Sequence, residues 1–182
     1  MAATPSARDR ILDAFEELLI EHGERASTLE AVARSAGVSK GGLLYHFASK
    51  DALVEGVLDR LAGQVEVDLE RMRTAPSGPV EYFIRTSVSS QSPLDRTIIA
   101  VARLAQGANP RARQSLQRMQ ADWLAIIEDT VHDPAVARAV MLLGDGMYYN
   151  SAMLPSAEAL ISSEDDMDRL LAVVADLVDR RS

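Results

Sequence analysis

One stretch, from Thr28 to Lys50, constrains the fold of this chain more strongly than any other. Its apolar residues recur at the spacing of a helix face, first at Val32 and Ala33 and again at Leu43 and Phe47. A glycine between the two runs favours a tight turn, because glycine adopts the left-handed backbone conformation at little cost. The stretch therefore predicts two short helices joined by a turn, with small, polar and basic side chains on the outside.

The cap residues give this stretch the pattern of a helix-turn-helix. Ser27 or Thr28 is expected to cap the first helix, and Ser39 is expected to cap the second. The second helix begins with Gly41 and Gly42, which are poor helix formers. Their small size favours close approach of the backbone to DNA, in a major groove about 12 Å wide.

The remaining sequence predicts further helices separated by breaks that contain proline and glycine. Residues 1–6 are predicted to be a disordered tail, and the clearest break lies at residues 74–79. Hydrophobic residues make up 47% of the 182 residues and aromatic residues only 4%, which favours an all-α fold. The additional helices are expected at residues 7–22, 50–73, 79–90, 95–106, 110–132, 134–153 and 163–181.

Several classes of protein are disfavoured by the sequence. It contains no cysteine, so disulfides and thiolate metal sites are excluded. No apolar run approaches the roughly 18 residues that a membrane span needs, and the N-terminus lacks the apolar segment of a signal peptide. The sequence has no glycine-rich phosphate loop, nucleophile elbow or zinc-protease motif. We expect a cytoplasmic protein that is not an enzyme, has no cofactor and does not enter a membrane.

The charge distribution is uneven. The whole chain carries a net charge of −8, yet residues 25–50 contain four basic residues and one acidic residue. A small cationic patch on an acidic body still attracts phosphates, because exposed charges are screened beyond about 8–10 Å. We expect the acidic remainder to weaken non-specific binding to DNA.

Taken together, these residues resemble the N-terminal signature of the TetR/AcrR family of transcriptional regulators, and the helix at 7–22 extends the match. The matching positions are Thr28, Val32, Ala33, Ala36, Gly37, Val38, Ser39, Lys40, Gly41, Leu43, Tyr45, His46, Phe47, Ser49, Lys50, Asp51 and Leu53. The resemblance implies an N-terminal three-helix DNA-binding domain at residues 1–50. It also implies a helical-bundle domain for ligand binding and dimerisation at residues 51–182.

The function implied is that of a ligand-responsive regulator, most commonly a repressor. It would bind a palindromic operator on double-stranded DNA as a homodimer and be released by a small-molecule effector, whose identity the sequence does not give. An activator or a ligand-independent architectural protein is an alternative. A second alternative is a helical small-molecule-binding or catalytic bundle with a degenerate DNA-binding headpiece.

The family's DNA contacts carry over to matching positions only. The resemblance implies phosphate contacts and base-edge contacts. Because few groups of the second helix can read bases, we expect specificity from Arg25, Thr28 or Lys40, from water, or from DNA shape. Leu44 could contact a thymine methyl group but cannot hydrogen-bond. Tyr45 could instead be a packing residue, and His46 and Lys50 could be ordinary surface residues. The DNA-binding candidates are Arg25, Thr28, Ser39, Lys40, Gly41, Gly42, Leu44, Tyr45, His46 and Lys50.

The second domain offers two weaker expectations. The helices at 134–153 and 163–181 are amphipathic or apolar nearly all round, which favours a four-helix bundle between two copies over a monomer core. Aromatic and apolar residues of the central helices could line a ligand pocket or simply form the core, and Arg103 could be a polar anchor or a surface residue. The ligand-binding candidates are Tyr82, Phe83, Arg103, Gln106, Met119, Trp123, Ile127, Met147 and Asn150.

Overall fold

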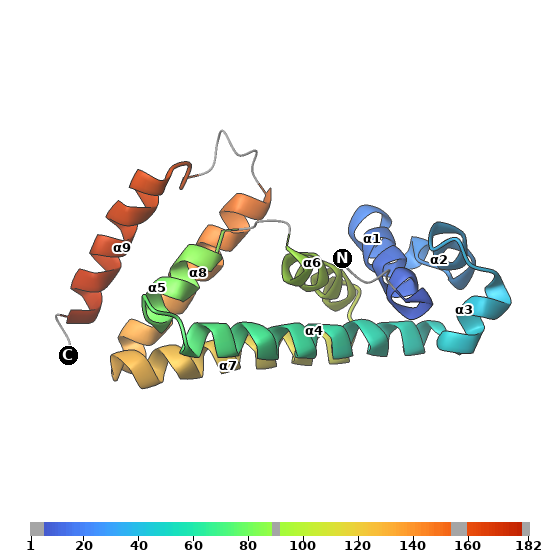
Figure 1. The fold of residues 1–182 in the computed structure, drawn as a ribbon, viewed down its shortest axis with the longest axis horizontal. Coiled ribbons are helices and arrows are strands. Elements are labelled where there is room, and N and C mark those ends of the chain that lie inside the picture. The colour runs from blue at the N-terminus through green and yellow to red at the C-terminus, as the bar shows by residue number, and fades with distance from the viewer. Residues whose placement is uncertain (1–5, 89–91, 154–159, 180–182) are drawn as a thin grey trace. The chain divides into compact units, whose positions relative to one another are not determined.

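The computed structural model describes residues 6–88, 92–153 and 160–179, which form helices and connecting loops without a β-strand (Figure 1). This confirms the predicted all-α fold. The helices are α1 (Ala7–Ala26), α2 (Leu29–Ser35), α3 (Lys40–His46), α4 (Lys50–Arg73), α5 (Pro79–Thr86), α6 (Pro93–Gln106), α7 (Pro110–Val131), α8 (Pro134–Met153) and α9 (Glu164–Asp179).

The helices fall into two compact units. The first unit comprises residues 1–65 and 93–118, and the second comprises residues 66–92 and 119–182. Helices α4 and α7 each contribute residues to both units. The expected boundary at residue 50 separates a DNA-binding domain from a ligand-binding and dimerisation domain, and it stays a prediction.

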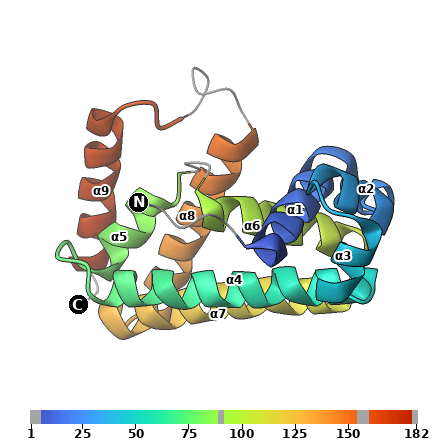
Figure 2. The same ribbon diagram turned by 45° about the vertical axis from the view of Figure 1, so that its right-hand side comes forward.

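In the first unit, α1, α2, α3 and the beginning of α4 share one apolar core. Gly56 allows α4 to approach this core closely, because a Cβ atom at this position would lie 2.8 Å from Cε1 of Phe47. Helix α6 packs along α1 on another side of the same unit (Figure 2). The fully buried side chains of this core include Ile11, Leu12, Phe15, Leu19, Val32, Leu43, Leu53 and Val57.

In the second unit, α5 packs against both α8 and α9, which also contact each other. Helices α5 and α8 approach closely at Gly144, where a Cβ atom would overlap the ring of Phe83 and lie 2.7 Å from Oγ of Ser87. Arg85 connects α5 to α9, since its Nη2 donates to Oδ1 of Asp168 over 2.8 Å.

Most helix ends follow their sequence signals. Gly23 interrupts α1 with φ of 75°, as predicted, although a further helical turn continues to Ala26. Asp133 caps α8, since its Oδ1 accepts from the backbone N–H of Ala135 over 2.8 Å. Ser163 caps α9 in the same way, accepting from the N–H of Asp166. Both caps follow from local sequence, since Asp133 directly precedes the first proline of α8 and Ser163 directly precedes α9.

Some boundaries differ from the predictions. Helix α5 ends at Thr86 rather than at residue 90, because the hydroxyls of Thr86 and Ser87 donate to the carbonyls of Tyr82 and Phe83 and complete the last turn. Residues 89–90 of that prediction lie outside the described residues, as do residues 180–181 of the predicted last helix and residues 1–5 of the predicted tail. Ser6, assigned to that tail, instead caps α1 by accepting from the N–H of Asp9.

Within the described ranges, no helix combines the length and the apolar character needed to cross a bilayer.

Candidate nucleic-acid interface

Helix α3 has one buried side and one open side. Leu43 is fully buried and Phe47, which follows the helix, is 3% exposed, as their spacing predicted. Leu44, Tyr45 and His46 are exposed, and 87% of Tyr45 is accessible to solvent. Tyr45 is therefore not a core packing residue, and its phenol ring instead contacts His46 edge-on, with ring centroids 5.1 Å apart.

The N-caps of α2 and α3 are both hydroxyl side chains. Thr28, and not Ser27, caps α2, since its Oγ1 accepts from the N–H of Ala31 over 3.2 Å. Ser27 is buried, and its hydroxyl donates to the carbonyl of Gly23 instead of capping α2. Ser39 caps α3 as predicted. The cap hydroxyls of Thr28 and Ser39 use an oxygen lone pair for the cap, so each keeps its proton for an external acceptor.

The two glycines of α3 differ in their surroundings. A Cβ atom at Gly41 would meet only Oγ of Ser39, at 4.0 Å, which leaves the position open to an approaching surface. A Cβ atom at Gly42 would lie 3.2 Å from the same Oγ. The backbone N–H of Gly42 donates to the Ser39 hydroxyl, which caps α3. A glycine at position 42 therefore leaves room for this hydroxyl.

The four cations of residues 25–50 are in two different states. Nζ of Lys40 lies 2.6 Å from Oε1 of Glu30, and this hydrogen bond lowers the pKa of the Glu30 carboxyl. The ammonium of Lys50 donates to the carbonyl of Glu24 at the end of α1. Arg25 and Arg34 are exposed and form no ion pair with any described residue. The sequence did not indicate that the two lysines already have partners within the chain.

A cation outside the predicted set lies beside α3. The guanidinium carbon of Arg8, in the first turn of α1, is 5.2 Å from the centre of the Phe47 ring. Sequence reasoning missed Arg8, because nothing in the local pattern of residues 6–10 relates it to a residue far along the chain.

Helix α1 is joined to α4 and α6 by a buried polar cluster. Glu16 is 3% exposed; its Oε1 accepts from the hydroxyl of Thr97 over 3.0 Å, and its Oε2 lies 3.2 Å from Nη1 of Arg60. Burial raises the pKa of the Glu16 carboxyl, although Arg60 and Thr97 oppose this effect. Arg60 also pairs with Asp13 over 2.7 Å. The acidic side chain of Glu16 would be expected to face solvent, and it is buried because α6 covers this side of α1.

Most of the ligand-binding candidates belong to the second unit. Phe83, Met119, Ile127 and Met147 are buried there. The rings of Phe83 and Trp123 lie 6.0 Å apart. Burial agrees equally with a pocket wall and with a plain core.

An acidic residue that the sequence did not single out organises the polar part of this group. The two carboxylate oxygens of Asp68 accept from the hydroxyl of Tyr82 over 2.8 Å and from Nε1 of Trp123 over 3.0 Å. Burial, together with the Asp68 carboxylate, raises the pKa of Tyr82 to about 12. Tyr82 therefore remains a neutral donor at physiological pH.

The three polar candidates, Arg103, Gln106 and Asn150, have hydrogen-bond partners of their own. Arg103 and Gln106 belong to the first unit, are exposed, and lie 3.5 Å apart at Nη1 and Oε1. Asn150 is half-buried, and its Oδ1 accepts from the N–H of Leu160 over 2.9 Å.

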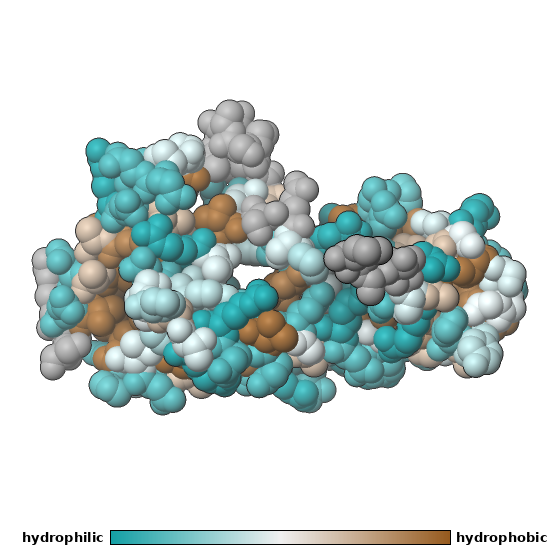
Figure 3. All heavy atoms as spheres, in the orientation of Figure 1, coloured by the Kyte–Doolittle hydropathy of each residue, from teal (hydrophilic) through white to brown (hydrophobic). Residues whose placement is uncertain are grey.

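Helices α8 and α9 carry large apolar side chains that other described residues leave uncovered. Leu142 and Tyr149 on α8 are 70% and 68% exposed, and Gly146 lies between them on the same side with nothing near its Cβ position. Val173 and Leu177, one turn apart on α9, are 65% and 40% exposed. Figure 3 shows hydrophilic side chains around the start of α9 and hydrophobic ones further along it.

Comparisons with known proteins give this geometry a context. Residues 11–57 match the family described as "Bacterial regulatory proteins, tetR family", and residues 77–178 match the "Tetracyclin repressor-like, C-terminal domain". The HTH-type transcriptional regulator UidR of Escherichia coli (strain K12) is 32% identical over 114 residues, which cover 60% of this chain. The match spans 57% of UidR, less than two thirds of that relative's length.

Solved structures have the same fold. The structure titled "Salmonella enterica GusR" matches with a TM-score of 0.68 and 20% identity, covering 95% of each chain. The structure of multidrug binding protein EbrR complexed with malachite green matches with a TM-score of 0.69 and 20% identity, over 95% of this chain and 98% of that one. The two family matches cover both ends of the sequence, so this chain belongs to the tetR family of bacterial regulatory proteins.

Proposed function

We propose that this protein is a DNA-binding transcriptional regulator that acts as a repressor and is released from its operator by a small-molecule effector. The observation that carries the proposal is the open side of α3, where Leu44, Tyr45 and His46 are exposed. The N-terminus of this helix is capped by Ser39, and the whole helix lies inside the segment that matches the family. This helix has the size and the side-chain character that a major groove accepts.

Most of the DNA contacts in this proposal go to phosphates. Tyr45 and His46 are exposed donors at the end of α3, and the cap hydroxyls of Thr28 and Ser39 have protons to donate. Lys40 would exchange its Glu30 partner for a phosphate, and Lys50 would share its ammonium with the Glu24 carbonyl. Each exchange costs an existing contact, which reduces the gain from binding DNA.

Base readout by α3 is limited in this proposal. Leu44 and the backbone at Gly41 and Gly42 would lie against base edges, yet among these only Leu44 has a side chain. Arg25, exposed in the last turn of α1, is the candidate for a more specific contact. DNA shape and water supply the remainder of the specificity.

The proposed operator-binding form is a homodimer built on α8 and α9. Exposed apolar groups such as Leu142, Tyr149 and Val173 are stabilised when a second copy covers them. Two helices from each chain can form a four-helix bundle around a two-fold axis. A two-fold dimer fits a palindromic operator, since the two half-sites are related by the same symmetry.

We assign effector binding to residues 51–182 and DNA binding to residues 1–50. Support for the effector comes from the aromatic and acidic group of Asp68, Tyr82 and Trp123. The contact of α6 with α1, which includes the Glu16–Thr97 hydrogen bond, offers a route by which a shift of α6 would reach the headpiece. An effector releases DNA only as far as it favours the state that binds DNA poorly.

The test is binding of the purified chain to its own upstream DNA and to a random duplex of equal length, at several salt concentrations. We expect tight, salt-sensitive binding to the upstream DNA and at least about 1,000-fold weaker binding to the random duplex. Tyr45→Phe is the matched variant, because it removes one exposed hydroxyl and leaves the core intact; it should cost about 1 kcal/mol of binding. Equal, weak binding to both duplexes would contradict the proposal.

A further inference from the structure

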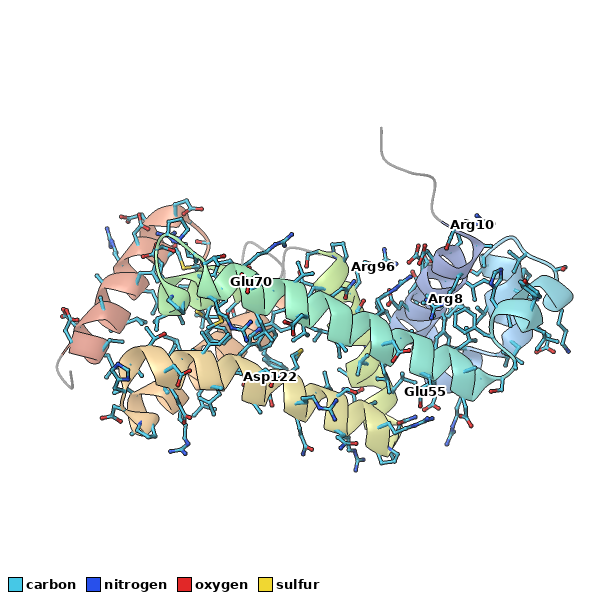
Figure 4. All side chains as sticks on the ribbon, turned by 60° about the horizontal axis from the view of Figure 1, so that its bottom comes forward. Arg8, Arg10, Glu55, Glu70, Arg96 and Asp122 are labelled. Atoms are coloured by element: carbon cyan, nitrogen blue, oxygen red, sulfur yellow. The ribbon has the colours of Figure 1, made fainter. Side chains whose placement is uncertain are left out.

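Arg8 is an exposed cation in the first turn of α1, and it forms no ion pair within the described part of the chain. The hydrogen bond from Ser6 and, to a lesser extent, the charge of Arg8 lower the pKa of the neighbouring Asp9 carboxyl. The nearby carboxylate of Asp9 is engaged by the hydroxyl of Ser6 over 2.6 Å. Arg8 and Arg10 leave the start of α1 in different directions (Figure 4). The guanidinium of Arg8 lies over an aromatic ring.

That ring belongs to a residue adjoining the DNA-binding helix. Phe47 is the C-cap of α3 and directly follows Tyr45 and His46. The Phe47 ring packs closely against α4. A Cβ atom at Gly56 of that helix would lie only 2.8 Å from Cε1 of the ring. A guanidinium that rests on a fixed ring loses little further freedom when it binds an anion. Arg8 is thus held near the end of α3 with its hydrogen-bond donors unclaimed by any carboxylate.

The charge of Arg8 also differs in kind from that of the two lysines nearby. Lys40 is paired with Glu30, and Lys50 donates to the carbonyl of Glu24. A phosphate that approaches either lysine competes with a hydrogen-bonded partner inside the chain, whereas the guanidinium of Arg8 forms no ion pair that a phosphate would have to displace. A guanidinium also matches the two oxygens of a phosphate in a bidentate arrangement.

We propose that Arg8 is a further DNA-contacting residue, which binds a backbone phosphate beside α3 while its planar group rests on Phe47. This inference depends on the proposed DNA-binding function. It extends the interface from the helix-turn-helix to the first turn of α1. Since the contact goes to a phosphate, it strengthens binding to every sequence and adds no base preference.

The test compares the wild type with Arg8→Ala, Arg8→Lys and a control, Arg73→Ala, in binding to the upstream duplex and to a random duplex. Arg73 is an exposed cation at the end of α4 paired with Glu70, so its loss changes the net charge equally. We expect Arg8→Ala to lower the slope of log K against log salt by about one for each chain bound, on both duplexes. Arg8→Lys should keep the slope but bind a few-fold more weakly, and Arg73→Ala should leave both unchanged.

The outcomes separate this inference from the function on which it depends. If the wild type binds the upstream DNA and Arg8→Ala keeps the full salt slope, Arg8 only packs on Phe47 and the inference is overturned. A lower melting temperature for Arg8→Ala with an unchanged slope leads to the same conclusion. If the wild type shows no salt-sensitive binding to either duplex, the proposed function fails and this inference fails with it.

Discussion

The open side of α3 and the open side of α8 are both exposed helix surfaces, yet their chemistry is opposite. The side of α3 presents a phenol, an imidazole and cap hydroxyls, with cations close by. The side of α8 presents Leu142 and Tyr149 with a glycine between them. A hydrated polyanion is bound by the first kind of surface, and a second protein copy by the second. Exposure alone therefore does not identify a site, and the groups exposed decide which partner fits.

The largest effect should come from a charge placed in the α8 surface. Leu142→Asp puts a carboxylate at a position that is 70% exposed in the single chain and would be buried between two copies. We expect the dimer dissociation constant to rise about 100-fold or more, as measured by analytical ultracentrifugation. Val67→Asp on α4 is the control, since Val67 is also an exposed apolar residue, at 52%. Equal dimerisation of wild type and Leu142→Asp would remove α8 from the interface.

The close contact between α5 and α8 can be tested by comparing Gly144 of α8 with Gly63 of α4. Gly144→Ala would place a methyl group against the Phe83 ring and 2.7 Å from Oγ of Ser87, so we expect a loss of about 1–3 kcal/mol in the free energy of unfolding. Gly63→Ala in α4 has nothing near its Cβ position and should instead stabilise by about 0.5–1 kcal/mol. Urea unfolding of both variants measures this difference, and equal stabilities would contradict the close α5–α8 contact.

A pH titration tests the buried contact between α1 and α6. Since burial raises the pKa of Glu16, the folded protein holds this proton more tightly than the unfolded chain. Its contribution to stability is therefore fully present below the unfolded pKa and is lost as pH rises through the higher, folded pKa. We expect Glu16→Gln to flatten this part of the stability–pH curve.

The matched control for this titration is Glu17→Gln, which removes a neighbouring exposed carboxylate and should leave the curve unchanged. Identical curves for the wild type and Glu16→Gln would mean that Glu16 does not titrate differently on folding.

The smallest effect concerns competition within the α3 region. Glu30→Gln should release Lys40 from its carboxylate partner and tighten binding to DNA of any sequence by about threefold, because exposed ion pairs are weak. Glu70→Gln on α4 is the control for the same change of charge, since Glu70 is also an exposed carboxylate with a cationic partner, Arg73. Fluorescence anisotropy with a random duplex at low salt provides the measurement. Weaker binding by Glu30→Gln would show that the pair orients Lys40 productively.

The α3 region could be predicted from sequence because its structure depends on neighbouring residues. Leu43 and Phe47 face inward at helical spacing, and the cap at Ser39 lies beside the helix it caps. Only the choice between Ser27 and Thr28 remained open, because both precede the helix and both are good caps.

The rest could not be predicted because its contacts join distant segments. Glu16 looked like a surface residue until α6 brought Thr97 to it. Asp68 has no local signal, since its donors Tyr82 and Trp123 lie on other helices. The apolar residues of α8 surround the helix, so sequence alone could not separate buried Met141 from exposed Leu142.

The central claim, that this chain binds a symmetric operator as a dimer through α3, is tested most directly by hydroxyl-radical footprinting on its own upstream duplex. The account predicts two protected patches related by two-fold symmetry, with centres about 34–36 Å apart or a multiple of that distance. It also predicts that Leu142→Asp removes both patches together at protein concentrations where the wild type protects them fully. A uniform pattern without protected patches, or a single patch that is unchanged in Leu142→Asp, would contradict the claim.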